Sequence, residues 1–119
     1  MHAGEQIPVV ETGTSLPQAL LVATSKGLGM TTVAASDGSL AGIFTDGDLR
    51  RAIDHGVDIH TATMNDVMTR NCKTIAPGTL AAEALKVMED SKINALVVQH
   101  DGNTVGVINM HDLLRAGVI

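Results

Sequence analysis

The chain has 119 residues and a formal net charge of −5, and 45% of its residues are hydrophobic. This length supports one compact body with a modest core. Phe44 is the only aromatic residue and no block of Lys or Arg is present. The sequence therefore lacks the stacking side chains and the basic face of a nucleic-acid binder. No apolar run is long enough to span a membrane.

The start of the chain and its cysteine content favour the cytoplasm. Residues 1–6 lack the basic end and the apolar stretch of a signal peptide, and they resemble the interior of a longer protein given an initiator Met. The lone Cys72 has no partner for an internal disulfide, which fits a reducing compartment. We expect a cytoplasmic protein that has neither nucleic acid nor a membrane as a partner.

An internal repeat divides the chain into two halves. With an offset of 65 positions, Gly13, Thr14, Ala19 and Leu20 recur as Gly78, Thr79, Ala84 and Leu85. After a one-residue deletion, placed before Val33, the offset becomes 64. In that register Val33, Asp37, Gly38, Gly42, Asp48, Leu49, Arg51 and Ala52 recur as Val97, Asp101, Gly102, Gly106, Asp112, Leu113, Arg115 and Ala116. Such a register across a whole half indicates two copies of one unit.

Each copy is predicted to run strand, helix, strand, strand, helix. Ser15 and Gln18 have the spacing of a capping box at the start of the first helix, and Gly27 is placed to end it. The predicted buried helix faces are Leu16, Ala19, Leu20 and Ala23, and then Ala81, Ala84, Leu85 and Met88. The predicted hairpins are 30–35 with 40–45 and 95–99 with 104–109, turning at Asp37-Gly38 and Asp101-Gly102. The predicted closing helices are 46–54 and 110–116.

These elements predict an α/β (α+β) fold. The first repeat is expected within residues 1–60, with its core at 7–53, and the second within 61–119, with its core at 73–117. Residues 55–71 are expected to join the halves, with one helical turn at 64–68. Because neither half has much core of its own, we expect them to pack as one body.

Thr45 and Asp48 are the first candidates for binding chemistry, because they follow a buried strand at a helix start. Their spacing is that of a capping box, which is common at helices of every kind. The same geometry suits a ligand: a helix N-terminus and a Thr hydroxyl bind phosphate, and an Asp one turn later accepts hydrogen bonds from the two hydroxyls of a ribose. The sequence leaves both interpretations open.

The second repeat departs from the first at this point. Asn109 stands in the place of Thr45, whereas Asp112 is retained. Asn can still cap a helix and donate a hydrogen bond. The sequence therefore leaves a second ribose site at Asp112 open, but the two sites cannot be equal. His111 falls within this loop and is a candidate ligand contact. The remaining histidines, His2, His55, His60 and His100, have no metal-ligand spacing and no cysteine cluster beside them, so no metal site is expected.

The repeated unit and its motif resemble the CBS domain. Residues 42–48 (GIFTDGD) match the family pattern of Gly, a hydrophobic residue, any residue, Thr, two further residues and Asp, and residues 66–69 (DVMT) resemble the start of a second CBS repeat. The resemblance implies a tandem pair with pseudo-twofold symmetry that binds an adenine nucleotide or a related effector between its repeats. The ligand-binding residues expected on these grounds are Met30, Thr31, Thr32, Thr45, Asp48, Arg50, Arg51, Thr69, Asn94, Ala95, Asn109, Met110, His111, Asp112 and Arg115.

A narrower resemblance concerns residues 2–8, 26–30, 42–51 and 110–117, which are similar to the C-terminal part of the D-arabinose-5-phosphate isomerases. In that family a sugar-isomerase domain precedes the CBS pair and serves 3-deoxy-octulosonate (Kdo) synthesis for lipopolysaccharide. The resemblance implies a regulatory module that is not itself an enzyme and requires no cofactor. Its expected effector is a nucleotide sugar such as CMP-Kdo, or alternatively AMP or ATP.

The expected partners are that isomerase domain and a second copy of the chain. We expect a homodimer of this module, within a tetrameric parent protein. A purely structural role, in which the pair holds subunits together and binds no ligand, is the alternative from a different class.

Overall fold

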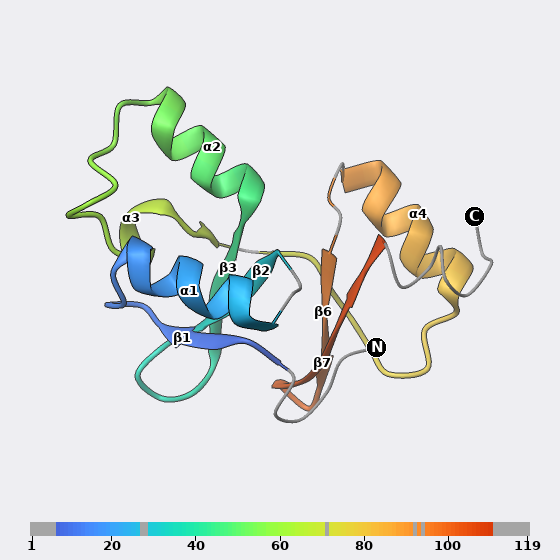
Figure 1. The fold of residues 1–119 in the computed structure, drawn as a ribbon. Coiled ribbons are helices and arrows are strands. Elements are labelled where there is room, and N and C mark those ends of the chain that lie inside the picture. Colours follow the sequence, from blue (N-terminus) through green and yellow to red (C-terminus); the bar gives the residue numbers. More distant parts are fainter. Residues whose placement is uncertain (1–6, 27–28, 71, 92, 94, 111–119) are drawn as a thin grey trace. The chain divides into compact units, whose positions relative to one another are not determined.

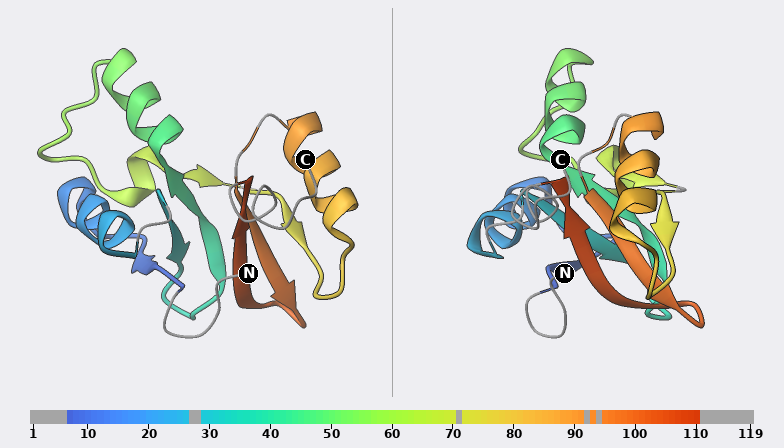
Figure 2. Two further views of the ribbon diagram at one scale, coloured as in Figure 1. Left: turned by 45° about the vertical axis from the view of Figure 1, so that its right-hand side comes forward. Right: turned by 90° about the vertical axis from the view of Figure 1, so that its right-hand side faces the viewer.

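The computed structural model describes residues 7–26, 29–70, 72–91, 93 and 95–110. Its chain forms two compact units, which divide between Asn71 and Cys72. Figures 1 and 2 show a small sheet in each unit, with several helices in the N-terminal unit and helix α4 in the described part of the C-terminal unit.

The N-terminal unit contains a mixed sheet of strand order β1-β2-β3-β4. Its elements are β1 (Val9–Glu11), α1 (Leu16–Lys26), β2 (Met30–Ala34), β3 (Leu40–Thr45), α2 (Asp46–Asp54), α3 (Met64–Val67) and β4 (Thr69–Arg70). Strand β1 runs parallel to β2, and the other two pairings are antiparallel. Helix α1 lies along β1 and β2, whereas α2 continues directly from β3 (Figure 1).

The C-terminal unit repeats the beginning of this order. Its elements are β5 (Thr74–Ile75), α4 (Ala81–Ser91), β6 (Ala95–His100) and β7 (Asn103–Asn109). Met110, which follows β7, is helical, and the rest of the predicted closing helix, 111–116, lies outside the described residues. The sheet order is β5-β6-β7, with a parallel and then an antiparallel pairing. Helix α4 packs against β6 (Figure 2). The predicted α+β fold and its repeated order are confirmed for these elements.

The predicted helix faces are confirmed. In α1, Leu16, Ala19 and Ala23 are buried, and in α4, Ala84 and Met88 are buried. The other predicted members, Leu20, Ala81 and Leu85, are half-buried and pack against the same cores. These positions lie on one side of a helix because three or four residues make one turn. Both hairpin turns are also confirmed, since Gly38, Asp101 and Gly102 all have a positive φ. Gly27 lies outside the described residues.

The strand register corrects one detail of the repeat. Val33 pairs with Gly42 in the first hairpin, and Val98 pairs with Gly106 in the second. The structural counterpart of Val33 is therefore Val98 and not Val97, and the one-residue deletion lies in the hairpin loop that follows. A loop can lose a residue without consequence, whereas a deletion ahead of the strand would turn each of its side chains to the opposite face.

The segment after α2 forms part of the N-terminal unit's core. Ala62, Met64 and Met68 are buried with Leu16 and Phe44. The backbone N–H of Leu16 donates to the Ala62 carbonyl at 3.0 Å, and that of Met64 donates to the Thr14 carbonyl at 2.9 Å. The predicted helical turn is present as α3. Three apolar residues among polar ones are a weak sequence signal, but they complete a small core here.

Candidate functional site

The start of α2 is a complete capping box. Thr45 is the N-cap residue, with the extended backbone that such a residue requires (φ −126°, ψ 172°). The Asp48 N–H donates to Thr45 Oγ1 at 3.3 Å, and the Thr45 N–H donates to Asp48 Oδ2 at 2.8 Å. The capping interpretation of this motif is confirmed. A ligand role would have to be added to it.

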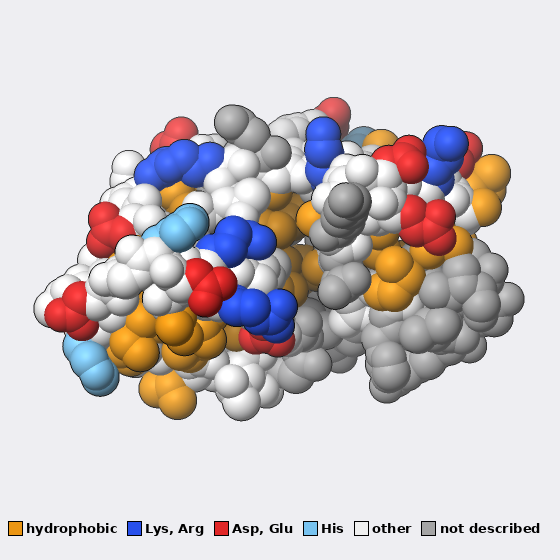
Figure 3. Space-filling view, turned by 90° about the horizontal axis from the view of Figure 1, so that it is seen from above, with side chains coloured by type: hydrophobic (Ala, Val, Ile, Leu, Met, Phe, Trp, Pro, Cys, Tyr) orange, Lys and Arg blue, Asp and Glu red, His pale blue; other side chains and the backbone are white. Residues whose placement is uncertain are grey.

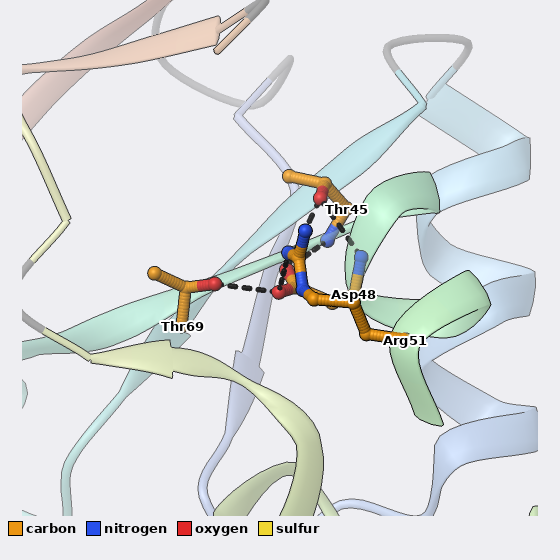
Figure 4. A network of polar contacts seen from close by, with 4 residues as sticks. All are labelled: Thr45, Asp48, Arg51 and Thr69. Atoms are coloured by element: carbon orange, nitrogen blue, oxygen red, sulfur yellow. Dashed lines mark hydrogen bonds and ion pairs between the residues drawn. The ribbon is translucent and has the colours of Figure 1, made fainter. Parts of the chain in front are cut away.

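The Asp48 carboxylate is buried and accepts more hydrogen bonds than a cap requires. Its side chain is 3% exposed. The hydroxyl of Thr45 donates to Oδ2 at 3.1 Å, while the Thr69 hydroxyl and Arg51 Nη2 both donate to Oδ1 at 2.5 Å (Figure 4). Four donors therefore surround this carboxylate, counting the Thr45 N–H. A buried carboxylate needs this compensation for its lost hydration.

Arg51 reaches Asp48 from one turn further along α2. Its side chain is 60% exposed, so solvent screens the ion pair and its contribution to stability is small. The guanidinium lies above Gly47, where an added Cβ would stand 3.4 Å from Arg51 Nη1. Arg50, the neighbouring candidate, is exposed on the same helix.

Thr69 comes from β4, 21 residues away from Asp48 in the sequence. Strand β4 pairs with β3, with Thr69 opposite Ile43 and Arg70 opposite Gly42. A Cβ on Gly42 would stand 2.3 Å from the Thr69 carbonyl oxygen, so only Gly permits this close approach. Gly42 is thus a positioning residue. The sequence pattern included it as the first residue of the 42–48 motif, but only the structure shows why a side chain is excluded there.

The three ligand-binding residues expected on β2 have buried side chains. Met30, Thr31 and Thr32 are 1%, 0% and 2% exposed. The Thr31 hydroxyl donates to the Thr32 carbonyl at 3.0 Å, and the Thr32 hydroxyl donates to the Pro8 carbonyl at 2.7 Å. The Thr32 N–H also donates to Pro8, at 3.0 Å. Hydrogen bonding to a base from this strand would therefore depend on the backbone of Met30, because Thr31 is paired with Phe44 of β3.

The second repeat aligns its candidates in the same register. Ala95 pairs with Asn109 at the end of the hairpin, as Met30 pairs with Thr45 in the first repeat. Asn109 and Met110 are half-buried, and Asn109 is hydrogen-bonded or otherwise paired. The predicted contacts Asn94, His111, Asp112 and Arg115 lie outside the described residues, as does His2.

Other chemistry on the described surface is sparse. Among the residues with described positions, no group of three or more His, Cys, Asp or Glu is arranged to hold a metal ion. Within those ranges, no helix has the length and apolarity needed to cross a membrane. Burial raises the pKa of the half-buried Cys72 thiol, which makes it a weak nucleophile at neutral pH. On the face shown in Figure 3, basic side chains are interspersed with acidic ones.

Comparison with known proteins agrees with this architecture. Residues 64–119 match the CBS domain family model. A CBS-domain protein of Agrobacterium tumefaciens superposes with a TM-score of 0.87 at 22% identity, covering 93% of this chain and 84% of that one. The CBS-pair protein CBSX2 of Arabidopsis thaliana gives 0.80 at 22%, covering 99% and 90%. A structure of CBSX2 in complex with AMP gives 0.79 at 23%, covering 99% and 92%.

The fold is therefore that of a tandem pair of CBS domains. Sequence similarity points to a narrower group of proteins than the fold does. This sequence is 60% identical over 120 residues to the arabinose 5-phosphate isomerase KdsD of Pseudomonas aeruginosa, covering 100% of this chain and 37% of that protein. The chain is homologous to the C-terminal part of this isomerase family, and it spans little more than a third of the length of the relatives it matches.

Proposed function

We propose that this CBS pair is the regulatory module of an arabinose 5-phosphate isomerase and that it binds a nucleotide-type effector. The observation that carries the proposal is the buried Asp48 carboxylate beside Thr45 at the start of α2, in a chain homologous to those isomerases. On this proposal the chain carries no catalytic site of its own. It acts in the cytoplasm on a sugar-isomerase domain of the same protein.

The chemistry of the site supports a ribose phosphate. The start of a nine-residue helix presents N–H groups and the positive end of a dipole, and Asp48 supplies acceptors for ribose hydroxyls. The Asp46 carboxylate in the same turn opposes a phosphate, so Arg50 and Arg51 are the side chains that would offset it. Structural kinship with CBSX2, which was solved with AMP, supports the same class of ligand.

Within this class we favour CMP-Kdo. An isomerase that supplies Kdo synthesis gains feedback control by sensing the activated sugar formed downstream. The carboxylate of that sugar also offers an anionic group to the arginines at α2. AMP and ATP are the alternatives, because CBS pairs commonly bind adenine nucleotides.

Calorimetric titration of CMP-Kdo, CMP, AMP and ATP tests the proposal. Loss of the ribose hydrogen bonds in Asp48→Ala should weaken binding by about 1.5–3 kcal/mol, which is tenfold or more. Asp112→Ala tests the second site in the same way. Asp66→Ala is the matched control, because Asp66 caps α3 in the same spacing but is exposed. If none of the four ligands binds the wild type, the sensing function is wrong.

A structural role is the second candidate, and exposed apolar side chains favour it. Val9, Leu21 and Ile53 are 53%, 64% and 56% exposed on the N-terminal unit. Side chains of this kind suit contact with a second copy of the module, as in a homodimer. Light scattering over a range of concentrations tests it, since a constant monomer mass contradicts a dimer. A dimer that binds none of the four nucleotides would favour a purely structural module.

A further inference from the structure

The acceptor capacity of Asp48 is already fully used within the N-terminal unit. A carboxylate offers about four lone-pair positions. Oδ2 accepts from the Thr45 N–H at 2.8 Å and the Thr45 hydroxyl at 3.1 Å. Oδ1 accepts from the Thr69 hydroxyl and from Arg51 Nη2, each at 2.5 Å. A ribose diol can therefore bind this carboxylate only by replacing donors that are present.

The two oxygens hold their donors by different means. The donors to Oδ2 belong to the N-cap residue, so their release would undo the start of α2. The donors to Oδ1 are a side chain that is 60% exposed and a hydroxyl on the two-residue edge strand β4. The Thr69 hydroxyl can leave by rotation about χ1, and Arg51 can swing into solvent. Oδ1 is thus the oxygen that can be vacated.

We propose that Thr69 and Arg51 are internal competitors for the effector, occupying Asp48 Oδ1 until a ligand with a vicinal diol displaces them. This inference rests on the proposed function and adds its regulation: the chain itself sets the affinity of the ribose site. The Thr69 hydroxyl and a ribose hydroxyl are alike as donors. The exchange therefore yields only part of the free energy of a new hydrogen bond.

Removal of the Thr69 hydroxyl should change effector affinity in the opposite direction from removal of a direct ligand contact. If the Thr69 hydroxyl bound the effector, its removal would weaken binding. If it competes with the effector, its removal leaves Oδ1 with an unfilled acceptor position and strengthens binding. Thr69→Val removes the hydroxyl at nearly constant shape and suits a strand, whereas Thr69→Ser retains the hydroxyl.

The test is calorimetric titration of AMP, CMP and CMP-Kdo, with 2′-deoxy-AMP and 2′-deoxy-CMP as probes that lack the diol, into the whole chain. We expect Thr69→Val to bind the ribose ligands about three- to tenfold more tightly than the wild type, with a smaller gain for the deoxy probes. Thr69→Ser should restore wild-type affinity. Thr63→Val is the matched control, because it removes a hydroxyl from the exposed box at Asp66 and should leave affinity unchanged.

Arg51→Gln provides a second variant that does not depend on β4. Titrated with adenosine and cytidine, which carry no phosphate for Arg51 to attract, it should also bind more tightly than the wild type. Equal or weaker binding by both Thr69→Val and Arg51→Gln overturns the competition while leaving the proposed sensing function intact. Binding by Thr69→Val but not by the wild type supports the competition. If neither the wild type nor any variant binds, the competition and the proposed sensing function are both wrong.

Discussion

Two Thr-x-x-Asp boxes in the N-terminal unit share the hydrogen bonds that Thr donates to Asp but have different surroundings. The Thr45 N–H donates to Asp48 at 2.8 Å, and the Thr63 N–H donates to Asp66 at 2.9 Å. In each box the Thr hydroxyl also donates to the Oδ2 atom that accepts from the Thr N–H, at 3.1 Å for Thr45 and 3.3 Å for Thr63. Asp66 is exposed, however, whereas Asp48 is 3% exposed and accepts two further hydrogen bonds.

The difference separates what a motif does from what a site requires. The spacing of Thr and Asp is sufficient to cap a helix, because all the groups involved lie within four residues. A buried, fully bonded carboxylate needs donors from elsewhere in the chain, here Thr69 on β4. The same four-residue pattern is therefore an ordinary cap at α3 and a candidate ligand site at α2.

The largest expected difference between the boxes concerns stability. Asp48→Ala removes four hydrogen bonds and leaves the half-buried Thr69 hydroxyl without its acceptor. We expect it to lower the free energy of unfolding by about 2–4 kcal/mol. Asp66→Ala should cost only about 0.5–1 kcal/mol, because water replaces the lost partner. Urea unfolding measures both, and equal costs would show that burial of Asp48 adds nothing to its capping role.

The next largest effect concerns the approach of β4 to β3. An added Cβ in Gly42→Ala would meet the Thr69 carbonyl oxygen at 2.3 Å, so the strands must separate and Thr69 must move away from Asp48. We expect a loss of about 1–3 kcal/mol in the free energy of unfolding.

Gly13→Ala is the control for this substitution, since nothing lies within 4 Å of its added Cβ. Its stability should stay within about 0.5 kcal/mol of the wild type. If Gly42→Ala is as well tolerated as Gly13→Ala, the close approach of β4 does not hold Thr69 in place.

A smaller effect on stability is expected for Arg51, the exposed partner of the buried Asp48. Arg51→Gln removes the ion pair with Asp48 but leaves the other three donors in place. Because Arg51 is 60% exposed, we expect a loss of about 0.2–1 kcal/mol that shrinks as salt is added. A loss as large as that of Asp48→Ala would mean that Arg51, and not the hydroxyls, stabilises the carboxylate.

The smallest effect concerns a third carboxylate, at the turn of the first hairpin. Hydrogen bonds from the Ser39 hydroxyl and from the Ser39 N–H lower the pKa of the exposed Asp37 below its ordinary 3.8. The stabilisation is complete above pH 3.8 and is lost as the pH falls through the lowered pKa of the folded state. Ser39→Ala should raise this pKa only partly, because the N–H remains. NMR titration measures it, and an unchanged pKa would exclude the hydroxyl as its main cause.

The elements themselves were predictable because their signals are local. The range 46–54 expected for the closing helix of the first repeat is that of α2, and 40–45 is that of β3. Capping, turn dipeptides and the period of apolar residues act over a few neighbouring positions. The place of the repeat deletion was predicted wrongly, because adjacent valines in β6 match Val33 equally well and only the pairing with Gly106 distinguishes them.

The sequence by itself determined the two repeats, their order of strands and helices, and the capping box at Thr45 and Asp48. Only the tertiary structure decided which of two similar boxes is buried. Gly42 brings β4 against β3, so that Thr69 meets Asp48 across 21 residues of chain. The physical reason is that a buried charge requires hydrogen-bond donors close to it in space. Such donors can come from distant parts of the chain, where a local sequence pattern does not identify them.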